Sequence, residues 1–284
     1  MKSAVLILLL AVPCAIAAQA PPNRLEADLA KAKADYDRDP STVDNAIWLG
    51  RRLAYLGRFP EAIDAFTLGI ARHPDEPRLY RHRGHRYITT RTFALAIADL
   101  KKASQLVAGK KDEVEPDGAP NKAGIPRSTL QSNIWYHLGL AQYLSGDFTG
   151  ALASYREGMK VSRVNDDMLV ATSDWLYMTL RRLKRDAEAR QVLEPIREQM
   201  DVIENGAYHA RLLMYQGLRT PESVLNLNTA DDIQIATQGY GVGNWYLVNG
   251  DRARAKDTFD RVLAGKATTA FGFIAAEADV TRGF

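Results

Sequence analysis

A repeat with a period of 34 residues constrains the fold of this chain more than any other feature of its sequence. The segments Val43–Glu76 and Ser132–Asn165 both carry small residues at repeat positions 8 and 20 and large apolar residues at positions 7, 17 and 24. Small residues let two helices cross closely, and large residues fill the groove between them. The residues at these positions are Leu49, Gly50, Phe59, Ala62 and Phe66 in one segment, and Leu138, Gly139, Phe148, Ala151 and Tyr155 in the other.

Further copies follow the same spacing. Pro77–Lys110 and Val170–Ile203 are clear copies, and Ala236–Thr269 is a weaker one. Between the last two, a helical stretch at Ala207–Gln216 and a shorter one from Pro221 indicate a degenerate copy. A repeat of this length predicts a row of helix pairs in which each pair contacts only its neighbours.

This pattern resembles the tetratricopeptide repeat family. The resemblance implies an all-α fold, a right-handed α-solenoid of stacked antiparallel helix pairs with capping helices at both ends. It departs from the family pattern at Tyr177, where the fourth copy should have a small residue, so the helices of that copy are expected to splay.

The repeats divide the chain into consecutive parts. Ser128 and Gln131 form a predicted capping box before the third copy. The parts are an N-terminal capping helix at 23–40, copies 1 and 2 at 43–110, an inserted loop at 109–127, copies 3 and 4 at 128–203, degenerate copies at 204–269 and a C-terminal capping helix at 270–284.

The first 18 residues have the pattern of a secretory signal peptide: a basic start, an apolar stretch over Ala4–Val12, and then small residues. Cleavage within 17–20, most simply after Ala17 or Ala18, predicts a periplasmic or secreted protein with no transmembrane span. Pro13 directly before Cys14 argues against a lipoprotein signal. Because Cys14 is the only cysteine, the mature chain can have no disulfide and no thiol catalysis.

The resemblance also implies a concave face built from the first helix of each pair. Repeat positions 2, 5, 6, 9 and 12 face it in this family, and many of the residues there are basic or aromatic. Such a groove favours a carboxylate or an acidic peptide, and its histidines would make binding depend on pH. The alternative is a solvated helix face. Trp175 is expected to be partly exposed. The predicted groove residues are Arg51, Arg78, Arg81, His82, His85, Asn133, Tyr136, His137, Asp174, Trp175 and Arg181.

The loop between copies 2 and 3, Gly109–Arg127, is too long for a connection within a helical array and is rich in proline, glycine and charge. One hypothesis is that its acidic stretch folds over the basic groove as a lid or pseudo-ligand. The other is that it is a tolerated surface insertion.

Together these features predict a non-catalytic adaptor or scaffold of the cell envelope that binds a protein or peptide partner in the concave groove. The alternative is a binding component for a small anionic ligand or acidic peptide. The net charge of +3 gives no drive toward nucleic acid. The sequence has none of the metalloprotease, nucleophile-elbow or phosphate-loop motifs, and we expect no cofactor and no metal. The exposed end repeats could pair with a second copy of the chain, so a homodimer is a further expectation.

Overall fold

The computed structural model describes residues 22–227 and 229–284, so the predicted signal peptide lies outside the described residues. The described part consists of fourteen α-helices and one short 3₁₀ helix, which confirms the all-α prediction. The helices are α1 (Pro22–Arg38), α2 (Val43–Tyr55), α3 (Phe59–Arg72), α4 (Pro77–Thr89), α5 (Phe93–Val107), α6 (Leu130–Ser145), α7 (Phe148–Val161), η1 (Ser162–Val164), α8 (Asp166–Arg182), α9 (Asp186–Val192), α10 (Gly206–Tyr215), α11 (Pro221–Val224), α12 (Asp232–Val248), α13 (Arg252–Ala264) and α14 (Phe271–Arg282).

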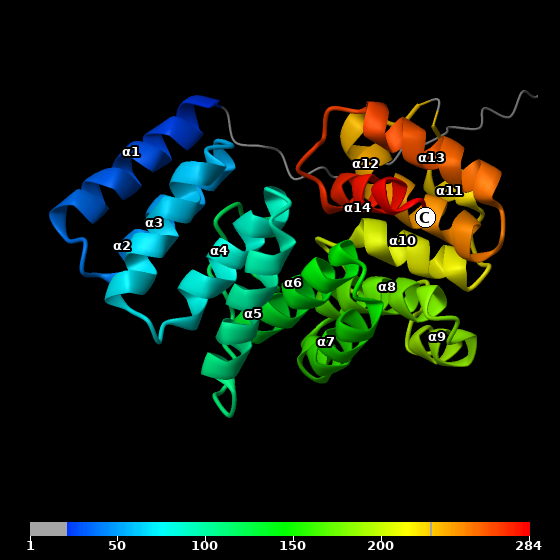
Figure 1. Cartoon of the computed structure of the whole chain (residues 1–284), viewed down its shortest axis with the longest axis horizontal. Coiled ribbons are helices and arrows are strands. Elements are labelled where there is room, and N and C mark those ends of the chain that lie inside the picture. Colours follow the sequence, from blue (N-terminus) through cyan, green and yellow to red (C-terminus); the bar gives the residue numbers. More distant parts are fainter. Residues whose placement is uncertain (1–21, 228) are drawn as a thin grey trace, which may run out of the picture.

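Consecutive helices pack as antiparallel pairs in a curved row that runs from α1 to α13 (Figure 1). The pairs α2/α3, α4/α5, α6/α7 and α12/α13 correspond to four of the repeat copies. Helix α1 covers the open side of α2 at the N-terminal end of the row. The helices α10 and α11 lie where the degenerate copy is predicted.

The glycine at repeat position 8 has a direct steric role. A Cβ atom added to Gly139 in α6 would lie 2.7 Å from Cε1 of Tyr155 in α7, closer than two carbon atoms can pack. The fourth copy has Tyr177 at this position, and its second helix, α9, is only seven residues long. The Tyr177 ring stacks instead on Tyr215 of α10, with 4.2 Å between centroids.

Helix α6 begins one residue later than the predicted capping box implies. Thr129 and Ser132, and not Ser128 and Gln131, form the box. The reason is that the Ser128 carbonyl accepts a hydrogen bond from Glu115 N at 3.0 Å, which holds Ser128 in an extended segment.

The C-terminal helices cover the inner face of copies 3 and 4. Helix α12 packs on α8, and α14 packs on α12, α13 and also α6, so the C-terminal helix does more than close the end of the array (Figure 1). The Asp279 carboxylate, fully buried in α14, accepts hydrogen bonds from Arg182 Nη1 and the Tyr240 hydroxyl, both at 2.8 Å. These contacts join α8, α12 and α14.

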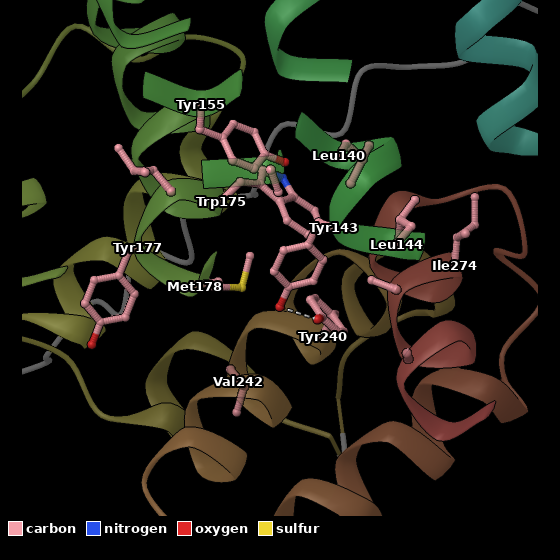
Figure 2. Close-up of a cluster of buried hydrophobic side chains, with 14 of the residues drawn as sticks. Leu140, Tyr143, Leu144, Tyr155, Trp175, Tyr177, Met178, Tyr240, Val242 and Ile274 are labelled. Atoms are coloured by element: carbon pink, nitrogen blue, oxygen red, sulfur yellow. Dashed lines mark hydrogen bonds between the residues drawn. The ribbon is translucent and has the colours of Figure 1, made fainter. Parts of the chain in front are cut away.

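An aromatic cluster fills the space between these helices. Figure 2 shows Tyr143, Trp175 and Tyr240 side by side, with the hydroxyl oxygens of Tyr240 and Tyr143 in hydrogen-bond contact at 2.6 Å. The rings of Trp175 and Tyr240 stack with 5.8 Å between centroids. The expectation that Trp175 is partly exposed was wrong: it is only 2% exposed, because α12 covers it.

Arg91 contacts α14 and the segment just before it. It lies in the turn between α4 and α5 with φ of 61°, where the corresponding turns of copies 1 and 3 have Gly57 and Gly146. Its guanidinium donates to Glu277 of α14 at 2.7 Å and to the Thr268 carbonyl at 2.8 Å. These contacts account for an arginine in a backbone conformation that favours glycine.

We predict that Gly139→Ala lowers the free energy of unfolding by about 1–3 kcal/mol, because the new methyl group would overpack the α6–α7 crossing. The matched control is Gly206→Ala at the start of α10, where an added Cβ meets nothing within 4 Å. Urea denaturation followed by circular dichroism measures both. Equal midpoints for the two variants would contradict the packing role of position 8.

Candidate functional site

A cavity of about 230 Å³ lies between α2, α4 and the loop segment 115–119. Charged side chains from α2, α4 and this loop segment meet there. The residues that line it are Arg51, Ala54, Tyr55, Phe66, Arg81, His82, His85, Arg86, Glu115, Pro116, Asp117, Gly118, Ala119 and Ser128.

Helix α4 supplies most of the basic side chains. Pro77 starts the helix, and the Glu76 side chain caps it by accepting from Arg78 N. Gly84 faces α5, where an added Cβ would lie 2.8 Å from Leu100, so this side of α4 packs closely on its partner helix. The opposite side presents two i,i+4 pairs, Arg81 with His85 and His82 with Arg86, toward the cavity.

The inserted loop covers this basic surface. A bridge between Val114 and Thr129, with Leu130 N donating to the Glu113 carbonyl at 2.8 Å, holds residues 113–115 beside the start of α6. The loop therefore contacts the basic groove, as the first of the two hypotheses for it requires. Farther along, Arg52 Nη1 donates to the Gly118 carbonyl at 3.0 Å.

Glu115 carries the main contact of the loop with α4. Its carboxylate, 7% exposed, lies 2.8 Å from Arg81 Nη2. The Asn133 amide of α6 donates to the same carboxylate oxygen, Oε2. His82 Nε2 lies 3.8 Å from the other oxygen. One carboxylate thus joins copies 2 and 3.

Arg86 is basic and lacks such a partner. No carboxylate of the described residues pairs with its guanidinium, which lies over the Phe59 ring at 5.8 Å from the centroid. Burial, and next the charge of Arg81, lowers the pKa of Arg86 to about 10, so it is still a cation at neutral pH. Arg51 beside it donates only to the Tyr55 hydroxyl, with Nη2 at 3.2 Å, and lies over the Trp48 ring.

Asp117 is the second acidic group of the cavity. Its Oδ2 atom is buried and has no hydrogen-bond partner among the described residues. Burial raises the pKa of Asp117, against the opposing effect of the Arg51 charge. The cavity therefore holds three guanidinium groups and two carboxyl groups, with a single close ion pair of Arg81 and Glu115 among them.

Three histidines lie at or beside this cavity: His82 and His85 line it, and His137 contacts His85. The His82 ring stacks on Phe66 with 5.6 Å between centroids, and its Nδ1 accepts from Arg81 Nη1 at 2.9 Å. The His85 and His137 rings lie 4.4 Å apart, and Phe271 of α14 touches both. Burial, followed by the charges of nearby arginines, lowers the pKa of all three histidines well below the usual value, so they are neutral at neutral pH.

The structure divides the predicted groove residues into two sets. Arg51, Arg81, His82 and His85 line the cavity, and Asn133 joins them through Glu115. The others hold the chain together: Arg78 pairs with Glu76 and Asp44, Tyr136 bonds to Tyr208 and Trp175, His137 bonds to the Asn133 carbonyl, Asp174 pairs with Arg211, and Arg181 pairs with Asp186.

Asp174 and Trp175 cannot be part of an open groove in this structure. The Asp174 carboxylate is fully buried and receives two hydrogen bonds from Arg211, at 3.0 and 2.6 Å. The positions of a repeat alone do not reveal this, because α10 and α12 approach from later in the chain and cover the inner side of α8.

Sequence reasoning missed several lining residues, chiefly Tyr55, Arg86, Glu115 and Gly118. Arg86 could have been found, since it lies four residues after His82 on the same helix face. Glu115 is one of several acidic residues in the loop, and only the backbone bridge to Thr129 determines which of them faces α4.

None of the helices in the described part of the chain combines the length and apolar character that crossing a bilayer requires. Within residues 22–227 and 229–284, no three His, Cys, Asp or Glu side chains are grouped so that they could hold a metal ion. The three histidines near the cavity therefore do not form such a group.

Comparison with known proteins gives a match at the level of fold. No protein-family model matches the sequence, and the search of curated proteins finds no similar sequence. Among solved structures, the anaphase-promoting complex assembly Cut9–Hcn1 superposes with a TM-score of 0.52 at 13% identity, over 90% of this chain and 45% of that one.

Two shorter tetratricopeptide repeat proteins match more of their own length. A protein from Parabacteroides merdae gives a TM-score of 0.49 at 12% identity over 89% of this chain and 93% of that one. YrrB, described as having an unusual peptide-binding site, gives 0.45 at 12% identity, over 87% and 97%.

We predict that acidification destabilises the protein through His82, His85 and His137. A histidine whose folded pKa is lowered contributes stability that is present above the unfolded value near 6.5 and is lost as the pH falls below it. The expected loss between pH 6.5 and 5.5 is up to about 1 kcal/mol per histidine. Urea unfolding at a series of pH values measures it, and His85→Gln should reduce the slope.

Tyr136→Phe is the control for this experiment. It disturbs the same cluster by removing the hydroxyl that bonds to Tyr208 and Trp175, but it removes no group that titrates in this range. It should lower stability at every pH and keep the wild-type slope. A wild-type slope in His85→Gln would show that this histidine takes up no extra proton on unfolding.

Proposed function

We propose that this chain, which has the tetratricopeptide-repeat fold, is a non-catalytic scaffold of the cell envelope that binds a carboxylate-bearing segment of a partner protein. The proposed site is the cavity between α2 and α4. The observation that carries the proposal is the cluster of Arg51, Arg81 and Arg86 in one cavity, where only Arg81 has a carboxylate partner within the described chain.

The energetics of buried charge support a carboxylate as the missing group. A cation removed from water is costly unless an opposite charge and hydrogen bonds replace the water. The guanidinium of Arg86 is half-buried and receives neither an opposite charge nor a hydrogen bond from the described residues. A carboxylate is the planar acceptor that matches a guanidinium with two parallel hydrogen bonds.

The position of the cavity supports a partner that approaches the N-terminal half of the array. Concave faces of helical repeats commonly hold extended segments of other proteins. In copies 3 and 4, α12 and α14 of the same chain cover that face. We therefore expect partner binding to depend on Arg51, Arg81 and Arg86, and to be independent of direct contacts by Asp174 or Arg181.

The envelope location rests on the sequence of the first 18 residues alone. The signal-peptide pattern there predicts export and cleavage after Ala17 or Ala18. N-terminal sequencing of the protein purified from the periplasm or the medium tests this. An uncleaved chain recovered only from the cytoplasm would contradict the location.

A small anionic ligand is the second candidate, and the size of the cavity favours it. A volume of about 230 Å³ suits a molecule or a side chain of roughly ten heavy atoms better than a whole peptide. In this function the chain would bind a small molecule that carries a carboxylate and would need no protein partner.

The two candidates differ in what an in-cell crosslink recovers from tagged protein. We predict that the wild-type chain recovers a discrete partner protein and that Arg51→Gln with Arg86→Gln reduces its yield by about tenfold or more, as expected for the loss of charge-assisted hydrogen bonds. Arg261→Gln in α13, an exposed arginine outside this cavity whose ion pair among the described residues is with Asp257, is the control for loss of a surface charge. Equal helicity of all forms is checked by circular dichroism.

The same partner recovered in equal amount by the double variant would remove this cavity from the function. No partner in any form, together with a carboxylate bound by the purified wild-type chain and not by the double variant, would favour the small ligand.

A further inference from the structure

We propose that Glu115 acts as a pseudo-ligand of this cavity and thereby determines the charge of the ligand that binds there. Glu115 occupies one of two carboxylate subsites, the one at Arg81. The other subsite, at Arg86 and Arg51, is left for a ligand with a single carboxylate. This inference rests on the proposed function of the cavity. It adds the charge of the ligand and the residue that determines it.

Glu115 is bound by side chains as a carboxylate ligand would be. Its carboxylate receives hydrogen bonds from Arg81 and Asn133, which come from two different repeats. Both are residues that the repeat positions predict to face a partner. A carboxylate held by a guanidinium and an amide from adjacent helices is bound as a ligand would be bound, although it belongs to the same chain.

The charges of the cavity leave room for one more carboxylate. Three guanidinium groups face two carboxyl groups, those of Glu115 and Asp117, and Glu115 pairs with Arg81. Arg86 remains without a carboxylate. One incoming carboxylate completes the pairing. A second would meet Glu115 at Arg81 and be repelled by it.

The loop that carries Glu115 is tethered on both sides of the cavity. Backbone hydrogen bonds at residues 113, 115, 128 and 130 fix the segment before the cavity, and Arg52 holds Gly118 after it. A Cβ on Gly118 would fall within contact distance of Arg51 and Tyr55, so the glycine lets the backbone pass close above the cavity. A tethered group competes at a high effective concentration, so a free carboxylate cannot easily displace Glu115.

The experiment compares two probes, propionate with one carboxylate and glutarate with two, by isothermal titration calorimetry of the full mature chain at constant ionic strength. Wild-type protein should bind propionate and should bind glutarate no more tightly. Glu115→Gln and Glu115→Ala should each bind glutarate at least about tenfold more tightly than wild type does, because the Arg81 subsite is then free. Arg86→Gln should lose propionate binding.

Glu113→Gln is the matched control. Glu113 is an exposed acid two residues away in the same segment, and its side chain makes no ion pair with the described residues. It changes the net charge by the same amount, so a general electrostatic effect would raise glutarate affinity in both variants equally. The pseudo-ligand role predicts the gain in the Glu115 variants alone.

Thermal stability provides a second measurement if the Glu115 variants unfold easily. Removal of Glu115 leaves Arg81 buried without its partner, so Glu115→Ala should melt at a lower temperature than wild type. Propionate should restore part of this loss, while the same concentration of chloride should not. Wild-type and Glu113→Gln proteins should gain less from propionate, since their Arg81 is already paired.

The outcomes separate this inference from the proposed function. Wild-type binding of propionate with unchanged glutarate affinity in the Glu115 variants would overturn the pseudo-ligand and leave the proposed site standing. No binding of either probe to any form would also overturn it, and the crosslinking experiment with the Arg51 and Arg86 variant would then decide the proposed function separately.

Discussion

The pairing of buried arginines with carboxylates is the constraint that shapes the inner face of this protein. Breaking a buried pair by removing one partner typically costs about 3–5 kcal/mol, which is a large part of the stability of a folded domain. The side chains of Arg81 and Glu115 are only 11% and 8% exposed, so loss of this contact would leave a buried charge without its partner. Together with the Val114–Thr129 bridge and the hydrogen bond from Arg52 to Gly118, it holds the inserted loop against α2 and α4.

The C-terminal half satisfies the same constraint entirely within the chain. Arg211 pairs with Asp174 between α10 and α8, and Arg182 pairs with Asp279 between α8 and α14. These pairs, with the aromatic cluster in Figure 2, close the inner face of copies 3 and 4. The inner face of the C-terminal half is therefore covered by helices of the same chain. The N-terminal half keeps a cavity with an arginine, Arg86, that has no acidic partner among the described residues.

The fold could be predicted from the sequence because its determinants are local and periodic. Gly139 opposite Tyr155 repeats what Gly50 does opposite Phe66, so one copy explains the next. The position of α14 could not be predicted in this way. It depends on Arg91 meeting Glu277 and on Asp279 meeting Arg182, contacts between residues about one hundred or more positions apart, which no periodicity encodes. The same limit explains why Trp175 is buried and why the site is smaller than the predicted groove.

The most direct measurement of the central claim is a crystal structure of the mature chain soaked with 3-bromopropionate, with data collected at the bromine absorption edge. The account predicts an anomalous peak in the cavity between α2 and α4, with the carboxylate bound to Arg86 and with Glu115 still on Arg81. A well-occupied carboxylate found elsewhere on the protein, with this cavity holding only water, would contradict it.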